Sequence, residues 1–591
     1  MAATDPHSYA DTEQGRIQHI SLQIEIDFDQ RVFHIRADYR LDRRVSGLFF
    51  LDCSGQDIKR VQAGTHSIAW KKDPPDAILG ERLRLIDLRG EQAFTIEFTT
   101  SARASALQWL DPAQTAGGKH PFVYSQCQAI HARSIFPCQD TPSVRITYDA
   151  QVSVPSGLTA VMAAAPTGVQ RDGAASAYSF RMPQPIPSYL FAIAVGELGF
   201  KALGPRTGIY AEPSVLDAAV WEFAENERKI IEAEKLFGPY LWDRYDLLIM
   251  PPSFPYGGME NPRLTFLTPT SLVGDRSNTP LITHELAHSW TGNLVTNATW
   301  GDFWLNEGWT TYAEVRISEV VEGEDQTQLG RILYLDLLRA EVQQFGSDSP
   351  HTRLKDPMEG EDPDLLVSGI PYYKGSFFLS RLEELVGRAA FDEFVHRYIA
   401  TYKFQSVTTE GFIEFLKQEL PAAAERVNLH AWIYEPGMPV DIPAITSTLY
   451  EDVQRRGADY TRTGVLPDRD DVRGWHYLQK RMFLRLLPRT IPADHCGKIA
   501  ALFGFEPDGN IRLLYEFYRT CIRSGYRDAL PGIEHFVEKV GRHAFLVPVI
   551  RTMTETEWTR DLVRPMFERY RHRHHPITVA AVDGVLAQAG L

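Results

Sequence analysis

The chain contains little cysteine, no long apolar run and no excess of positive charge. Only five cysteines occur among 591 residues; they are too scattered for a disulfide framework, which favours a reducing compartment. The apolar stretch Tyr189 to Val195 is too short to span a bilayer, and the first fifteen residues lack the pattern of a secretion signal. A formal net charge of −15 disfavours nucleic acid as a partner. We therefore expect a cytoplasmic monomer that binds neither membranes nor nucleic acid.

The first third of the chain has the periodicity of β-strands. Apolar residues alternate with polar ones from Ile20 to Phe28 and again from Phe33 to Leu41, on either side of a turn at Asp29, which predicts a β-hairpin. The same alternation returns further along, up to Val154. Residues 1–199 are therefore expected to form an N-terminal antiparallel β domain with one buried face.

Helical spacing begins after Ser214 and continues to Gly238, with the serine as a plausible N-cap and the glycine as a stop. This predicts one long helix at the start of a second domain, residues 200–434.

A segment rich in proline then predicts an extended linker over residues 435–450. Helical spacing from Ile511 to Ile522 predicts an all-helical C-terminal domain over residues 451–591, built from stacked helix pairs. The basic run Arg569 to His575 is interpreted as a solvated helix end rather than a metal or nucleic-acid site.

The strongest chemical signal is the segment THELAHSW, which contains His284, Glu285 and His288. Two histidines four residues apart lie on the same face of a helix, one turn apart, so both imidazoles can reach one metal ion. Glu285 between them is placed beside a metal-bound water, where it can act as a general base. The motif predicts a zinc site, although this spacing alone is only moderately specific.

Glu307 follows His288 by nineteen residues, on a second helix-like segment. Two histidines and one carboxylate leave the fourth position of a tetrahedral Zn²⁺ open for water, as catalytic zinc requires, and zinc lowers the pKa of that water to about 7. We therefore expect one Zn²⁺ per chain. Glu314 lies on nearly the same helical face as Glu307 and is a candidate partner for a ligand histidine; a solvated or salt-bridged helix carboxylate is the alternative.

Several motifs occur in an order that resembles a known family. They are QCQAIHARSIFPCQDTPSV (126–144), FPYGGMEN (254–261), HELAHSW (284–290), WLNEG (304–308) and PYYKG (371–375). The chain resembles the gluzincin zinc aminopeptidases of the membrane alanyl aminopeptidase type, and within them the leukotriene A4 hydrolase branch. The resemblance implies a multidomain α+β protein: an N-terminal saddle-shaped β domain, a thermolysin-like catalytic domain and a superhelical C-terminal α domain.

The same resemblance implies roles for further residues. Glu260, assisted by Gln128, would bind the free α-amine of a peptide, and Asn306 would support the metal ligands. The residues expected to contact the substrate chain are Ala129, Tyr256, Gly257, Gly258 and Met259, with Tyr256 either lining the pocket or simply packing. An internal peptide bond has no ammonium group to offer Glu260, so this arrangement implies exopeptidase action at the N-terminus of peptide substrates.

Tyr372 would, by the same resemblance, donate a hydrogen bond to the oxyanion of the tetrahedral intermediate. Its neighbour Tyr373 is the competing candidate, because adjacent helical residues point about 100° apart and only one can face the site.

Three positions bear on whether the epoxide hydrolase activity of the leukotriene A4 hydrolase branch applies to this chain. The leukotriene A4 hydrolase branch has a second tyrosine where this chain has Val367, and a histidine where it has Trp309. Asp364 is retained and matches a carboxylate that the family uses for epoxide opening and for basic peptide side chains.

In the C-terminal domain Arg542 matches an arginine that binds the substrate carboxylate in the family. An ordinary surface arginine is the alternative. At the position of a neighbouring family lysine, this chain has Ala544.

The sequence therefore predicts a zinc aminopeptidase that hydrolyses N-terminal residues from short peptides. Glu285 takes a proton from water and returns it to the leaving amine, while the metal and Tyr372 stabilise the oxyanion. Two alternatives remain: epoxide hydrolase activity on a fatty-acid epoxide in the same site, and a catalytically silent peptide-binding protein on a decayed peptidase fold.

Overall fold

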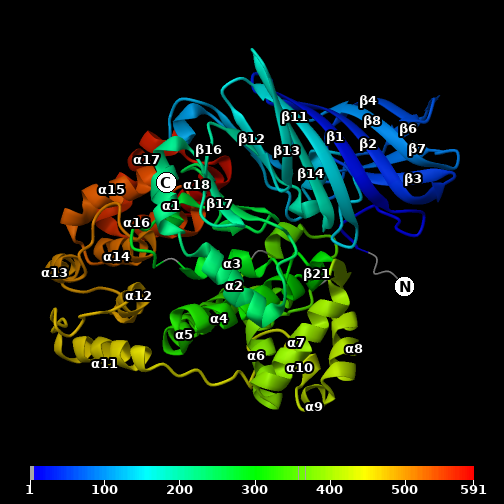
Figure 1. Cartoon of the computed structure of the whole chain (residues 1–591). Helices are drawn as coiled ribbons and strands as arrows, with labels where there is room; N and C mark the ends of the chain where they lie inside the picture. The colour runs from blue at the N-terminus through cyan, green and yellow to red at the C-terminus, as the bar shows by residue number, and fades with distance from the viewer. Residues whose placement is uncertain (1–4, 278, 357, 367) are drawn as a thin grey trace.

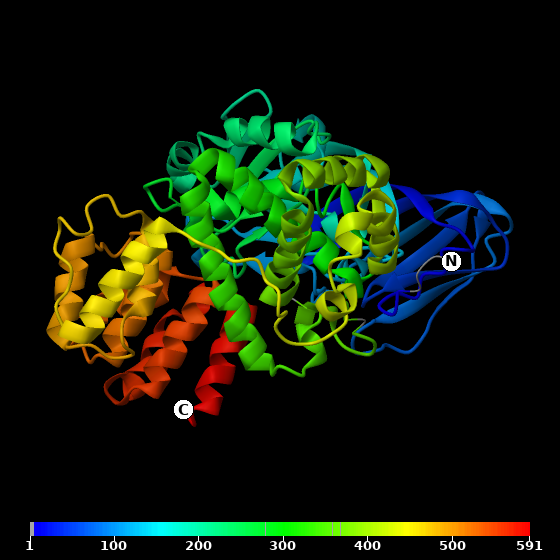
Figure 2. The same ribbon diagram turned by 90° about the horizontal axis from the view of Figure 1, so that it is seen from below.

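The computed structural model describes residues 5–277, 279–356, 358–366 and 368–591. The chain folds into three parts, which follow one another in sequence. In Figure 1 the β-rich N-terminal part is blue and cyan, the middle part is green, and the helical C-terminal part is orange and red. Figure 2, seen from below, shows the middle part between the other two. Residues from all three parts can therefore meet around the middle one.

The N-terminal part is built around an eight-stranded sheet in the order β13-β14-β11-β1-β2-β8-β4-β5. The predicted hairpin is confirmed: β1 and β2 pair antiparallel with Ile24 opposite Ile35. One pair departs from the antiparallel pattern, because β1 and β11 run parallel, which their wide separation in the chain allows. The strands are β1 (Ile17–Asp27), β2 (Val32–Val45), β4 (Asp57–Ala63), β5 (His66–Ser67), β8 (Glu91–Thr99), β11 (Arg145–Pro155), β13 (Ala165–Asp172) and β14 (Ala175–Pro187).

Two smaller sheets complete this part. One has the order β12-β15-β10-β9 and the other the order β3-β7-β6. Their strands are β3 (Leu48–Cys53), β6 (Trp70–Lys72), β7 (Glu81–Ile86), β9 (Leu107–Leu110), β10 (Phe122–Ser125), β12 (Thr159–Met162) and β15 (Ile193–Gly196). Alternate residues of β1, from Ile20 to Ile26, are buried, as the period of two requires for a sheet with one face in the core.

The middle part combines a five-stranded sheet, in the order β16-β17-β18-β20-β19, with ten α-helices among the residues that the structure describes. The strands are β16 (Gly199–Ala202), β17 (Thr207–Ala211), β18 (Tyr245–Ile249), β19 (Gly258–Met259) and β20 (Leu264–Leu267), and a separate pair is formed by β21 (Val295–Asn297) and β22 (Gln405–Val407). The helices are α1 (Pro213–Glu222), α2 (Asn226–Phe237), α3 (Thr279–Ala287), α4 (Trp304–Glu322), α5 (Glu324–Phe345), α6 (Gly375–Val386), α7 (Arg388–Tyr402), α8 (Thr409–Glu419), α9 (Pro421–Ala424) and α10 (Leu429–Ile433).

The single helix expected after Ser214 is wrong: the structure has two, α1 and α2. The chain bends between them at Phe223, whose side chain is buried, so packing outweighs a continuous helical pattern. The first helix begins at Pro213, two residues earlier than predicted, and its N-cap residue is Glu212 rather than Ser214. In the first turn the missing N–H of Pro213 costs no hydrogen bond. Gly238 ends α2 at φ +92° as expected.

The C-terminal part is helical. Residues between α10 and α11 have no regular secondary structure apart from short turns. The helices are α11 (Thr448–Thr463), α12 (Tyr477–Leu486), α13 (Ala493–Phe503), α14 (Ile511–Arg523), α15 (Leu530–Lys539), α16 (His543–Glu555), α17 (Glu557–Tyr570) and α18 (Pro576–Gln588). Contacts run from α11 to α12, α14, α16 and α18 in turn, so the helices stack as a superhelix. Their core also includes Leu329 and Leu333 of α5, which joins this part to the middle one.

The basic run at the end of α17 is not simply a solvated helix end. His574 and His575 are buried: the His574 ring stacks on Phe567 at 5.5 Å, and the His575 side chain caps α18. The neighbouring Arg571 makes surface ion pairs, as expected. The histidines are buried because the chain turns back between α17 and α18 and contacts the N-terminal part, where Gln114 donates a hydrogen bond to the His574 carbonyl at 3.0 Å.

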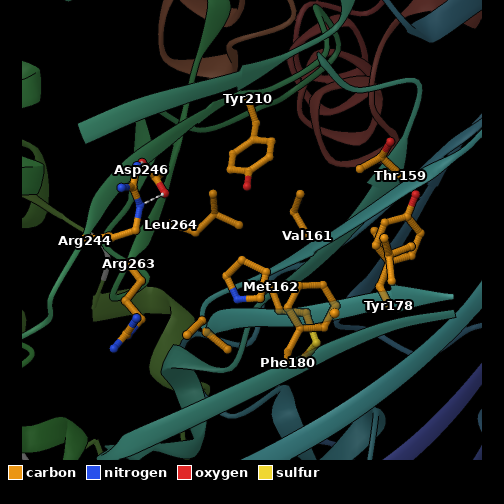
Figure 3. A pocket seen from close by; sticks show the side chains of 16 residues that line it. Thr159, Val161, Met162, Tyr178, Phe180, Tyr210, Arg244, Asp246, Arg263 and Leu264 are labelled. Carbon is orange, nitrogen blue, oxygen red and sulfur yellow. Dashed lines mark hydrogen bonds and ion pairs between the residues drawn. The ribbon is translucent and has the colours of Figure 1, made fainter. Parts of the chain in front are cut away.

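A cavity of about 300 Å³ lies between the N-terminal sheets and the five-stranded sheet. Figure 3 shows apolar walls with the Tyr210 hydroxyl pointing inward, beside the ion pair of Arg244 and Asp246. The cavity contains none of the residues predicted to act in catalysis.

All five cysteines are buried and unpaired, as expected for small apolar residues. Among the described residues no helix combines the length and the apolar character needed to cross a membrane.

Candidate active site

The predicted metal-binding side chains come together where α3 meets α4. His284 Nε2 lies 3.2 Å from Glu307 Oε2, and His288 Nε2 lies 3.6 Å from the same oxygen. The potential ligand atoms of these three residues all lie within 4.8 Å of one another. Helical spacing places both histidines on one face of the α3 segment, and α4 packs against that face. Two imidazole nitrogens and a carboxylate oxygen around one point are the donor set of a catalytic Zn²⁺.

A second layer of side chains orients these donors. His284 Nδ1 lies 3.1 Å from Glu314 Oε2, and the Tyr334 hydroxyl of α5 donates a hydrogen bond to the other Glu314 oxygen. Glu314 is buried, so it is not a solvated helix carboxylate. Its contact turns His284 Nε2 towards the metal position, because a hydrogen bond at one ring nitrogen sets the role of the other.

His288 is held in a corresponding way by Thr310, whose hydroxyl lies 3.2 Å from its Nδ1. Gly292 packs against the same ring: a Cβ there would lie 2.5 Å from His288 Nδ1 and would also clash with the Asn306 side chain. Asn306 donates a hydrogen bond to the Tyr189 hydroxyl at 3.2 Å, which links α4 to the N-terminal part. Sequence reasoning missed Thr310, although it follows Glu307 by three residues on one helical face; no local pattern indicates Tyr334.

Glu285 faces strand β19 across the site. A Cβ added to Gly258 would lie 2.5 Å from Glu285 Cδ and closer still to its carboxylate oxygen, so only glycine leaves room for this side chain. Burial raises the pKa of Glu285 to about 8, with Glu307 adding to the rise and His284 opposing it. A carboxyl group that ionises near neutral pH can both take up and release a proton.

Glu260 completes a group of three buried carboxylates. It lies at the end of β19 and can approach a common ligand with Glu285 and His288. Its Oε1 is buried and has no hydrogen-bond partner among the described residues. Burial, together with the charges of Glu307 and Glu285, raises the pKa of Glu260 well above its usual range. An unpartnered buried oxygen among like charges is stabilised by cations, which fits a metal ion beside it and an ammonium group on it.

Tyr372, not Tyr373, faces the metal-binding side chains. Its ring stacks on His284 with the centroids 5.8 Å apart, whereas Tyr373 stacks on Tyr334 at 4.9 Å. Both lie in a π-helical turn, Ile370–Lys374, a feature common at functional sites. Gly308 and Gly375 pack backbone against backbone: a Cβ on either would lie 2.8 Å from the Cα of the other. This contact brings Tyr372 close to Glu307.

The segment that contains Gln128 forms a side wall. The Gln126 amide contacts Met259 Sδ at 3.2 Å, and Ala129 N donates to Asp364 Oδ1 at 3.2 Å. Gln128 is partly buried in the same segment. Asp364 also contacts His131, which sequence reasoning did not select. Val367 lies outside the described residues.

Tyr256 and Gly257 precede β19. Tyr256 is partly buried and packs edge-on against Phe254. Burial, and then the negative charge of Asp364, raises the pKa of Tyr256, so Tyr256 lies near enough to the side wall to be affected by that charge. A Cβ on Gly257 would lie 2.6 Å from an Arg542 Nη atom.

Trp309 points away from the site. It is buried in an aromatic core, stacked on Tyr398 with the centroids 4.8 Å apart. The substitution of histidine by tryptophan therefore changes the packing between α4 and α7 rather than the surface of the site.

Arg542 reaches the site from the C-terminal part. His543 N donates to the Pro255 carbonyl at 3.2 Å, and Gly541 sits so close to Ser253 that a Cβ would lie 2.7 Å from its Cα. Two Arg542 nitrogens, Nε and Nη1, are buried and find no partner in the part of the chain that the structure describes. Arg542 is thus not an ordinary surface arginine.

Arg542 belongs to a basic cluster that sequence reasoning missed. Burial, and then the charge of Arg512, lowers the pKa of Arg542 to about 9, with Arg481 acting in the same direction. Arg481 lies 3.6 Å from Glu516, which also pairs with Arg485. Ala544 is exposed. Clustered guanidinium groups in a partly buried position favour an anion.

Known proteins match this chain over nearly its whole length. Residues 11–190 match the Peptidase M1 N-terminal domain, residues 221–432 the Peptidase family M1 domain, and residues 475–586 the Leukotriene A4 hydrolase C-terminal domain. The chain is 38% identical to leukotriene A-4 hydrolase of Xenopus laevis over 97% of this chain and 98% of that protein. It is 35% identical to leucine aminopeptidase 2 of Aspergillus niger over 98% of this chain and 97% of that protein.

Solved structures give the same result. The structure of native yeast LTA4 hydrolase superposes with a TM-score of 0.92 at 30% identity, covering 99% of this chain and 97% of that one. An M1 zinc metallopeptidase of Deinococcus radiodurans shares the fold, with a TM-score of 0.60 at 22% identity over 75% of this chain and all of that one. Matches to all three parts, together with relatives that align over the full length, show that the chain belongs to peptidase family M1, with a C-terminal domain of the leukotriene A4 hydrolase type.

Proposed function

We propose that this protein is a zinc aminopeptidase that removes N-terminal residues from short peptides. The observation that carries the proposal is Glu260, a buried carboxylate with one oxygen that has no partner within the described ranges, beside the donor set of His284, His288 and Glu307. An α-ammonium group satisfies this oxygen and offsets the surplus negative charge. Because only the first residue of a peptide has that group, binding it places the first peptide bond at the metal.

The side chains divide the chemistry between them. When bound, Zn²⁺ supplies an activated water and polarises the carbonyl that is attacked. Glu285 takes the proton of the attacking water and passes it to the leaving amine. Tyr372 donates a hydrogen bond to the carbonyl oxygen as negative charge develops there. Glu314, Thr310 and Asn306 hold the metal-binding side chains in place, and Gln128 assists Glu260 in binding the amine.

The backbone and the basic cluster bind the rest of the peptide. Gly257 and Gly258 let the β19 segment approach an extended substrate closely, and Ala129, Tyr256 and Met259 are proposed to line its path. Arg542, with Arg512 behind it, is proposed to bind the C-terminal carboxylate. A fixed distance between an ammonium site and a carboxylate site favours short peptides.

The test is a panel of fluorogenic aminoacyl amides, each with its N-acetylated counterpart, with and without a chelator. Hydrolysis of the free amines alone, abolished by the chelator and restored by Zn²⁺, is the expected result. Glu260→Ala should raise KM selectively for substrates with a free amine. Equal cleavage of the N-acetylated compounds by the parent protein would contradict the exopeptidase assignment.

Epoxide hydrolysis is a second candidate, favoured by the Asp364 carboxylate at the side wall and by the 38% identity to a leukotriene A-4 hydrolase. We propose it as an accompanying activity of the same site. Incubation with a fatty-acid epoxide should yield a diol in the parent protein and less diol in Asp364→Asn; diol formation at the uncatalysed rate would dismiss it.

We further propose that residues 1–199, 200–434 and 451–591 form the three domains, joined by a linker at 435–450, and that the protein is a cytoplasmic monomer. Five buried free thiols support a reducing compartment. Limited proteolysis cutting between α10 and α11, and light scattering at the mass of one chain, are the expected results.

A further inference from the structure

The side wall of the site contains a histidine–aspartate pair, His131 and Asp364, in which the histidine has no assigned role. His131 Nε2 lies 2.9 Å from Asp364 Oδ2, and His131 Nδ1 lies 2.8 Å from Ser105 Oγ. The other Asp364 oxygen accepts the Ala129 N–H. With both ring nitrogens engaged, the imidazole cannot rotate without breaking two hydrogen bonds. His131 therefore holds the Asp364 carboxylate in one orientation.

The pair remains open to a ligand. The side chain of His131 is 24% exposed and that of Asp364 is 44% exposed. Residues 126–131 connect this pair to the substrate strand, through the contact between Gln126 and Met259. The arrangement proposed below has the side chain of the first residue of a peptide, held at Glu260, against this wall.

The charge on the wall depends on the proton of His131. Burial alone would lower the pKa of His131, but the hydrogen bond and charge of Asp364 outweigh it and raise that pKa; Asp140 and Asp362 act in the same direction. In return, His131 lowers the pKa of Asp364 against the effect of burial. With His131 protonated the pair is neutral; without that proton the wall carries the negative charge of Asp364.

We propose that His131 is a positioning residue whose protonation controls how strongly Asp364 binds a cationic N-terminal side chain, so that peptides beginning with arginine or lysine are favoured at higher pH. The proposal rests on the proposed aminopeptidase function. A guanidinium group and the imidazolium of His131 compete for the same carboxylate. Because the pKa of His131 is raised above 6.5, the competition ends as the pH rises through values above that point.

The experiment measures kcat/KM for arginyl and leucyl 7-amido-4-methylcoumarin between pH 5.5 and 9. The quantity compared is the ratio of the arginyl value to the leucyl value at each pH. Groups that titrate equally for both substrates, including the α-amine, cancel in this ratio. In the parent protein the ratio should rise about tenfold with pH, because an opposite charge at hydrogen-bond distance shifts a pKa by a unit or more, which corresponds to tenfold in binding. His131→Gln should make the ratio independent of pH, and Asp364→Asn should lower it at every pH.

His19 provides a matched control. Its ring also lies between a hydroxyl and a carboxylate, 2.8 Å from Thr147 Oγ1 and 3.2 Å from Asp149 Oδ2, but it lies on β1 of the N-terminal sheet. His19→Gln should keep the pH profile of the parent. Melting curves of each variant check the fold.

A ratio that does not change with pH in the parent, or an unchanged rise in His131→Gln, would overturn the proposal. The parent and Asp364→Asn profiles test it even if His131→Gln fails to fold. Loss of hydrolysis of both substrates in the parent would instead contradict the aminopeptidase function, so the two failures are distinguishable.

Discussion

Gly258→Ala should inactivate the enzyme while leaving its metal and its fold in place. The added Cβ would lie 2.5 Å from Glu285 Cδ, where an ordinary contact needs at least 3.4 Å. The Glu285 side chain must therefore retreat by about 1 Å or turn away from the substrate. A misplacement of 1 Å costs about 10²-fold in rate, equivalent to about 2.7 kcal/mol of transition-state stabilisation.

The assay is kcat for a leucyl amide, measured with zinc content and melting temperature on the same preparation. Zinc should stay at one ion per chain, because the three atoms nearest to the added Cβ all belong to Glu285, which is not one of the three metal-binding residues. The melting temperature should change little, since the displaced group is the mobile end of a side chain. Gly330→Ala is the matched control: its Cβ would meet only Leu478, at 3.8 Å, and activity should be retained. Full kcat in Gly258→Ala would refute the reasoning, as would a loss of zinc that accounts for the inactivity.

Four further outcomes are expected. Glu285→Gln should keep zinc and lose about 10²- to 10⁴-fold in kcat, the range for a general acid or base; a near-normal rate would reject its role. Tyr372→Phe should lower kcat by about 10²-fold with little change in zinc content, whereas Tyr373→Phe should be close to the parent, and the reverse order would exchange the two assignments. Removal of zinc by a chelator should lower the melting temperature, because three buried carboxylates are then left without a cation; an unchanged transition would argue against the site. Arg542→Leu should raise KM about tenfold for tripeptides with a free carboxylate but not for their amides, and equal effects on both would exclude carboxylate binding by Arg542.

The sequence by itself determined the features that depend on local spacing. His284 and His288 lie one helical turn apart, so their shared face follows from the geometry of any helix. Alternation across residues 20–41 gave the first hairpin for a similar reason, because successive side chains of a strand point to opposite faces. The family motifs added Glu260 and Tyr372, whereas the spacing after His288 by itself predicts Glu307 as the third ligand.

Tertiary packing decided the rest. The choice between Tyr372 and Tyr373 follows from a π-helical turn and from the contact between Gly308 and Gly375, neither of which has a periodic signal. Trp309 adjoins the site in sequence but points into the aromatic core, because its ring stacks on Tyr398 of α7. Phe223 breaks a helix whose pattern was continuous. In each case burial of a large side chain or contact between distant backbones outweighed the local preference.

The charged groups at the edges of the site show most clearly what local sequence patterns do not determine. His131 and Asp364 are 233 residues apart in the chain, and Arg542 reaches Gly257 only because the C-terminal helices contact the segment before β19. Periodicity records which face of an element is buried, but not which distant element covers it. That information appears only when the three parts of the chain pack together.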